Sequence, residues 1–166
     1  MFNKISALLF IFLFSVFVTA QQAKDKSNQQ IVDVKFCDLL KNQDEYKDKT
    51  VRLKATYRYG FEWSELYCSN CVGKGQVWVD FADSFEESSK KKYRKKLNEN
   101  GEGGRTVNVT FVGKFLAQGH YGHMGGYSYN FVVEKVENAE IIYKYSPVFN
   151  SLPEEAKLKT YCQKNN

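Results

Sequence analysis

The sequence has few of the residues on which catalytic or metal chemistry usually depends, with two histidines and four cysteines among 166 residues. It contains no Walker-type phosphate loop, no G-x-G-x-x-G fingerprint and no G-x-S-x-G nucleophile elbow. Carboxylates such as Glu62 and Glu65 lie close together, but nothing in the sequence places them about a bond to be broken. These absences favour a binding protein over an enzyme.

Long apolar runs are also missing, except in the first 20 residues. That segment carries one charge, Lys4, followed by an apolar-rich run from Ile5 to Val18 that ends in Val18-Thr19-Ala20. A positive start, an apolar centre and a small-residue exit are typical of a secretory signal peptide. The run is shorter than the roughly 20 apolar residues of a membrane span. We therefore expect cleavage after Ala20, a secreted or periplasmic location and no membrane span.

Charge of one sign is not strongly in excess. The formal net charge is +5, and it becomes +4 when residues 1–20 are removed with Lys4. This value is below the basic footprint of a dedicated nucleic-acid binder, although it would help association with anionic surfaces. The expected partners are therefore an anionic small molecule, an oligosaccharide or another exported protein. Residues 21–30 are polar and predict a disordered leader, and residues 31–166 fit a single domain.

Alternation of apolar and polar residues predicts a strand-rich domain. Between Thr50 and Tyr59 the apolar residues Val51, Leu53, Ala55, Tyr57 and Tyr59 all fall on one face. Helical spacing predicts a helix at 36–46, and a capping box at Ser84 with Glu87 starts another at 84–97. Strands are expected at 50–59, 61–67, 76–81, 106–115 and 127–145, with a break near Asn138 and a loop at 118–126.

Three strands, a helix and two more strands form the element order of the OB-fold, a five-stranded Greek-key barrel. The stretch CDLLKNQDEYKDKTVRLKATY is a short helix leading into a charged alternating strand. It resembles the opening of small exported bacterial OB-like proteins of uncharacterised function, and the resemblance covers roughly residues 35–140. It implies a mainly β fold: an OB-like barrel with an extra N-terminal helix and a helix between strands 3 and 4. It supplies no catalytic residue, and a sandwich or meander with a helical insertion is the alternative topology.

The four cysteines all follow the expected signal peptide, so two disulfides are the default in an oxidising compartment. Of the three pairings that four cysteines allow, we expect Cys68–Cys71 together with Cys37–Cys162. The second bond would join the start of the folded region to its end.

The alternative for two of these cysteines is a metal centre. The only histidines form the sequence His120-Tyr121-Gly122-His123. Together with Cys68 and Cys71 they would complete a tetrahedral Cys2His2 zinc set. The two pairs lie almost fifty residues apart, and the sequence leaves open whether their loops meet. No cofactor is expected on the main interpretation, and zinc is the alternative.

The outward residues of the strands supply the expected ligand surface. Arg52, Lys54 and Arg58 form a basic row on 50–59, and Trp78 points outward from 76–81. OB-folds hold oligosaccharides and single strands on aromatic platforms beside cations. The same row would also serve as a charged face that prevents edge pairing. If the row binds an anion, affinity should fall steeply with salt. The residues expected to bind an anionic or oligomeric ligand, without catalysis, are Arg52, Lys54, Arg58, Trp78, Tyr121 and Tyr127.

Overall fold

A computed structural model of the protein describes residues 30–60, 62–68, 70–71, 75–83, 85, 87–97 and 104–144. Contacts divide the chain into Met1–Gln30 and Ile31–Asn166, and every helix and strand below belongs to the second unit. The expected signal peptide and all of the expected leader except Gln30 lie outside the described residues. None of the helices described is long and apolar enough to cross a membrane.

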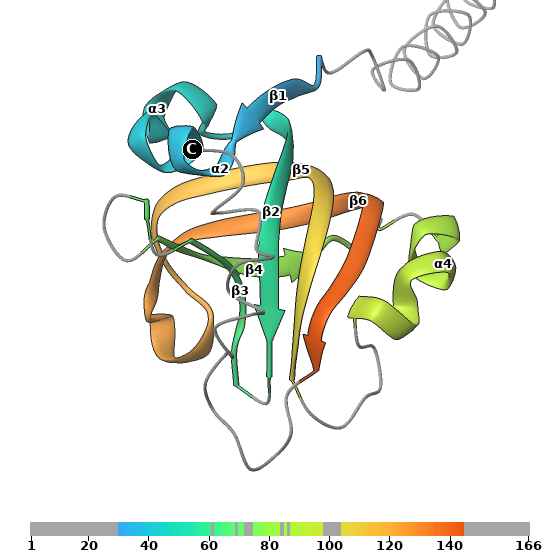
Figure 1. Ribbon diagram of the computed structural model, residues 1–166. Coiled ribbons are helices and arrows are strands. Elements are labelled where there is room, and N and C mark those ends of the chain that lie inside the picture. The colour runs from blue at the N-terminus through green and yellow to red at the C-terminus, as the bar shows by residue number, and fades with distance from the viewer. Residues whose placement is uncertain are drawn as a thin grey trace, which may run out of the picture. The chain divides into compact units, whose positions relative to one another are not determined.

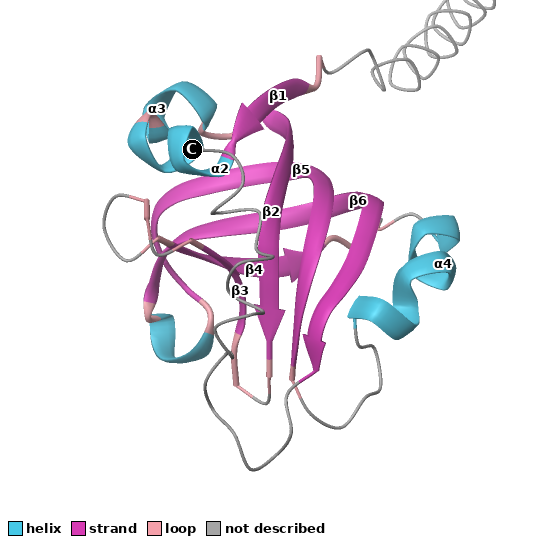
Figure 2. Cartoon of the chain, in the orientation of Figure 1, coloured by secondary structure: helices cyan, strands magenta, loops and turns pink. Residues whose placement is uncertain are grey.

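The domain is mainly β, as the alternating sequence predicts (Figure 2). Its elements, in chain order, are β1 (Val32–Lys35), α2 (Phe36–Lys41), α3 (Gln43–Tyr46), β2 (Thr50–Tyr59), β3 (Ser64–Tyr67), β4 (Gln76–Phe81), α4 (Glu87–Leu97), β5 (Arg105–Tyr121), the 3-10 turn η1 (His123–Gly125) and β6 (Tyr127–Lys144).

The six described strands form one sheet that closes on itself (Figure 1). β2 pairs antiparallel with β3 on one side and with β5 on the other. β3 pairs antiparallel with β4, β4 parallel with β6, and β6 antiparallel with β5. Five strands therefore form a closed ring, in which the order of pairing is β2-β3-β4-β6-β5 and β5 pairs again with β2. β1 lies outside this ring and pairs in parallel with the first half of β2.

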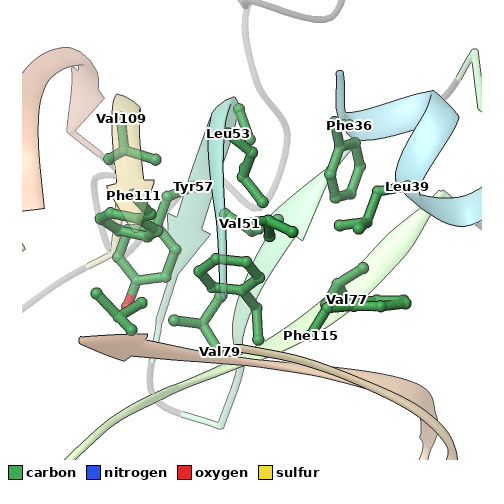
Figure 3. Close-up of a cluster of buried hydrophobic side chains, with 14 of the residues drawn as sticks. Phe36, Leu39, Val51, Leu53, Tyr57, Val77, Val79, Val109, Phe111 and Phe115 are labelled. Atoms are coloured by element: carbon green, nitrogen blue, oxygen red, sulfur yellow. The ribbon is translucent and has the colours of Figure 1, made fainter. Parts of the chain in front are cut away.

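The core lies inside the ring of strands. Because side chains alternate along a strand, one set from each strand points inward. The predicted inward face of β2 is confirmed, since all five of its apolar residues are at most 4% exposed. Figure 3 shows part of this core, with Phe36 and Leu39 of α2 lying beside Val51. Other inward residues, all buried, are Val77, Val79, Val107, Val109, Phe111 and Phe115.

The two longest strands differ from their expected bounds. β5 runs to Tyr121, so the loop expected at 118–126 is reduced to residues 122–126. The last strand is not broken near Asn138. Its register with β5 instead shifts between Thr110 and Phe111, which skips Glu137. A β-bulge of this kind absorbs one residue and lets the strand continue.

Glycine placement explains a second irregularity in the same pair of strands. The register also shifts between Val112 and Gly113. A Cβ atom on Gly113 would overlap the carbonyl oxygen of Val132, so only glycine allows the two backbones to approach there. This agrees with the sequence, in which Gly113 interrupts an alternating strand.

The N-terminal part of the domain also differs from expectation. The helix expected at 36–46 is two short helices separated at Asn42. β1 was not predicted, although Val32-Asp33-Val34-Lys35 alternates, because four residues are a short run on which to recognise a strand. Ser84, the expected helix cap, lies outside the described residues.

Candidate functional site

The six residues expected to bind a ligand lie on two different surfaces of the barrel. Arg52 and Lys54 belong to the first half of β2, where Lys54 is in register with Lys35 of β1. Arg58 is at the other end of β2, in register with Glu65 of β3. The basic row is therefore divided, and its two parts have different neighbours.

Arg52 is engaged in a surface ion-pair network. Its Nε donates to Oε2 of Glu137 at 2.8 Å and its Nη2 donates to Oε1 at 3.2 Å, while Nη1 lies 3.4 Å from Asp33. These bonds to Glu137, with its charge, raise the pKa of Arg52. Lys54 is exposed and forms no ion pair within the described residues. Only one of the two cations in this part of the row is therefore available to an anion.

Arg58 forms a more buried pair. Its Nε donates to the carboxylate of Glu65, which is only 2% exposed. The guanidinium carbon also lies 3.6 Å from the ring centroid of Tyr67 and 5.9 Å from that of Trp63. A buried carboxylate requires partners, and the hydroxyl of Tyr127 donates to the other Glu65 oxygen at 2.8 Å. Arg58 thus neutralises Glu65 and orders the aromatic residues around it.

Two aromatic rings meet where β4 faces the start of β6. The ring centroids of Trp78 and Tyr127 are 5.2 Å apart and the planes are tilted by 57°. Both side chains are half-buried, so part of each remains accessible. Burial of the Tyr127 hydroxyl, together with its bond to Glu65, raises the pKa of Tyr127. Tyr121, at the end of β5, is in register with Tyr127, so the β5–β6 hairpin lies next to this ring pair.

Hydrogen bonds connect Trp78, Asp80 and Asn130. Nε1 of Trp78 donates to Oδ1 of Asp80 at 2.8 Å, and Nδ2 of Asn130 donates to Oδ2 of the same carboxylate at 2.9 Å. Asp80 is exposed and has no ion pair within the part of the chain that the structure describes. Asn130 is 4% exposed, and its Oδ1 has no hydrogen-bond partner among the residues that the structure describes.

These residues form a continuous group on the outer side of β3 and β4, which we call the aromatic face. Its members are Arg58, Trp63, Glu65, Tyr67, Trp78, Asp80, Tyr127 and Asn130.

Five members of the aromatic face were not among the expected ligand residues. Strand alternation already placed Asp80 outward beside Trp78, and this signal could have found it. Glu65 and Asn130 gave no local signal, because their partners Tyr127 and Asp80 are 62 and 50 residues away in the chain. Trp63 and Tyr67 became candidates only through their contact with Arg58.

The cysteine pairing expected from the sequence is wrong. Cys37 of α2 is bonded to Cys71, with Cα atoms 5.0 Å apart, so neither Cys68–Cys71 nor Cys37–Cys162 forms. The reason is spatial, since Cys37 of α2 lies next to both Cys71 and Cys68, with its Sγ 3.7 Å from the Sγ of Cys68. No described cysteine is a free thiol, and Cys162 lies outside the described residues.

The zinc set expected from the sequence is not brought together. Within the described residues, the group of potential ligands that meet within 4.8 Å consists of Cys37, Cys68 and Cys71. His120 and His123 do not belong to it and are exposed on the β5–β6 hairpin. Cysteines bonded as disulfides also lack the thiolate that binds zinc.

A comparison of the chain with protein families, with curated proteins and with solved structures found no match in any of the three.

Proposed function

We propose that the protein is an OB-like barrel that binds an oligosaccharide on its aromatic face, without catalysis. The order of strand pairing supports the fold assignment. Counted from β2, the five strands of the ring pair in the order 1-2-3-5-4 and back to 1, with strands 3 and 5 parallel. α4 connects strands 3 and 4, and α2 and α3 precede strand 1.

The place of the aromatic face supports the binding proposal. OB-folds bind oligonucleotides and oligosaccharides on strands 2 and 3, between the loops that join strands 1–2 and 4–5. In this chain those strands are β3 and β4, which carry Glu65, Tyr67, Trp78 and Asp80. The first loop contains Trp63, and the second is the hairpin turn that includes η1.

The charges of the face favour an uncharged or donor-rich ligand over an anion. The observation that carries the proposal is the half-buried Trp78 ring beside the exposed, fixed carboxylate of Asp80. Arg58, the nearest cation expected to bind an anion, is already paired with Glu65. Phosphates would meet Asp80 without a compensating charge. Sugars instead offer hydroxyl donors to these acceptors and apolar faces to the rings.

The two tryptophans of the protein are Trp63 and Trp78, and both belong to the aromatic face. Intrinsic fluorescence therefore reports on this surface directly. We expect neutral oligosaccharides to shift the emission with an affinity that changes less than about twofold between low and high salt, because little charge is screened. Trp78→Ala should weaken binding about tenfold, the range found when a stacking ring is removed.

The matched control is the double variant Arg52→Ser/Lys54→Ser, on the other part of the basic row. It should bind as the wild type does. Loss of binding in this control with retention in Trp78→Ala would instead assign the ligand to the basic row and overturn the proposal. So would binding of anionic oligosaccharides alone, with an affinity that falls steeply with salt.

A further inference from the structure

The aromatic face carries one carboxylate that no described cation neutralises. Arg58, the arginine of this face, is paired with Glu65, and Arg52 on the other part of the basic row is paired with Glu137. Asp80 receives only two neutral donors, one on each oxygen. Among the described residues this carboxylate therefore has no cationic partner, although the chain as a whole has a net charge of +5.

The donors that hold Asp80 also fix how it faces a ligand. A carboxylate offers about four lone-pair directions, and Trp78 and Asn130 use one on each oxygen. The remaining directions are open on an exposed side chain. The acceptor that a ligand meets there is oriented before binding, which lowers the entropic cost of recognition.

Asn130 adds a second, independent observation. Its side chain is 4% exposed, and Oδ1 is buried without a partner while Nδ2 is used by Asp80. Buried polar atoms without a partner are rare in folded proteins and need an explanation. A buried acceptor without a partner, next to a carboxylate without a cation, favours a ligand that brings hydrogen-bond donors and positive charge.

We infer that Trp78, Asp80 and Asn130 form a subsite for a protonated primary amine carried by the ligand, as in a de-N-acetylated amino sugar. An ammonium group has three donors and no acceptor, which complements a surface of carboxylate and amide oxygens. The Trp78 ring adds a cation–π attraction, for which tryptophan is the best of the aromatic side chains. A hydroxyl group in the same place would gain neither the charge pairing nor the ring attraction.

This inference rests on the proposed function and names the class of sugar that the aromatic face selects. A lysine side chain carries the same ammonium group. The amino sugar is favoured because Tyr127, with its ring centroid 5.2 Å from that of Trp78, extends the ring surface on the side away from Asp80, which suits a linear chain of pyranose rings.

The test compares three probes against the chain lacking residues 1–20, at a pH that keeps the amines protonated. The probes are a β-1,4-linked tetramer of glucosamine, the matching tetramer of N-acetylglucosamine, and tetralysine. Wild type should bind the glucosamine tetramer at least about tenfold more tightly than the acetylated one. Asp80→Asn should abolish this preference and keep the weaker binding of the acetylated tetramer. Glu140→Gln, which removes an exposed carboxylate from β6, should leave the preference unchanged.

The other outcomes separate the two proposals. Equal binding of both tetramers would overturn the amine subsite and leave oligosaccharide binding standing. If tetralysine binds as tightly as the glucosamine tetramer, the ligand is a basic peptide and not an amino sugar. Failure of both tetramers to bind would overturn the proposed function itself, and the amine subsite with it.

Discussion

Gly122 lies directly against the indole ring of Trp78. A Cβ atom on Gly122 would be 2.5 Å from Cδ2 of Trp78 and 2.9 Å from Cδ2 of Tyr127. The backbone of Gly122, with φ +70° and ψ −164°, is in a region that essentially only glycine adopts. The β5–β6 hairpin therefore closes onto the aromatic face because this one residue has no side chain.

Gly122→Ala should destabilise the protein by about 1–3 kcal/mol, the cost of holding such a backbone conformation with a side chain. It should also shift the tryptophan emission, because the Trp78 ring must move. Gly126→Ala is the matched control, since its φ is −73° and the nearest atom to an added Cβ is 3.5 Å away. That variant should be neutral or more stable by up to about 1 kcal/mol. Equal urea midpoints for the two variants would contradict the packing of Gly122 on Trp78.

The two arginines of the basic row should differ sharply in their effect on stability. Arg58→Ala leaves the buried carboxylate of Glu65 without its cation, which should cost about 3 kcal/mol. Arg52→Ala removes a partly exposed pair and should cost less than about 1 kcal/mol. Chemical denaturation of both variants at the same pH measures the difference.

The double variant Arg58→Ala/Glu65→Gln provides the control for the first of these effects. Removing both charges leaves no buried carboxylate uncompensated, so part of the lost stability should return. If the double variant is no more stable than Arg58→Ala, the cost comes from lost packing of the guanidinium on Tyr67 and not from the charge.

Local pattern predicted which side of each strand is buried, as the alternation of Val51, Leu53 and Ala55 demonstrates. It also placed Trp78 on the outside of the barrel. Both are properties of a single strand, because side chains alternate with a period of two whatever the strand pairs with.

The partners of these residues could not be predicted in the same way. Arg52 has the residue type of an anion-binding group, yet its charge is taken by Glu137, which is 85 residues away in the chain. Cys37 of α2 is bonded to Cys71, which is 34 residues away in the chain. Such contacts depend on how the ring of strands closes, and a single sequence contains no local signal for that closure.

The Cys37–Cys71 bond gives a prediction that mass spectrometry can check. Trypsin should release residues 36–41 joined to residues 59–74, a fragment that contains both Cys68 and Cys71. Because Cys68 is not a free thiol, a third cysteine-containing peptide should be attached to the fragment at that residue. Fragmentation between those two cysteines should place the link on Cys71. A bond between Cys37 and Cys68, or a bond within the second peptide, would contradict the arrangement.

Removal of the same bond tests its contribution to stability. Cys71→Ser should cost about 4 kcal/mol in the chain-entropy description, because the bond closes a loop with a sequence separation of 34 residues. Addition of a reductant should likewise lower the midpoint of thermal unfolding of the wild type. An unchanged midpoint in the variant would show that the bond does not stabilise the fold.

Stability should fall in alkaline solution because of buried tyrosines. Burial raises the pKa of Tyr57 to about 12, whereas an unfolded tyrosine ionises near about 10. The folded state therefore keeps a proton that the unfolded chain loses, so this contribution is complete below about pH 10 and disappears as the pH rises towards 12. The slope should reach about 1.4 kcal/mol per pH unit for this residue, and Tyr59, whose pKa is also raised by burial, acts in the same direction. In Tyr57→Phe the urea midpoint should fall less steeply with pH across this range than it does in the wild type. An equally steep fall in the variant would exclude Tyr57 as the cause.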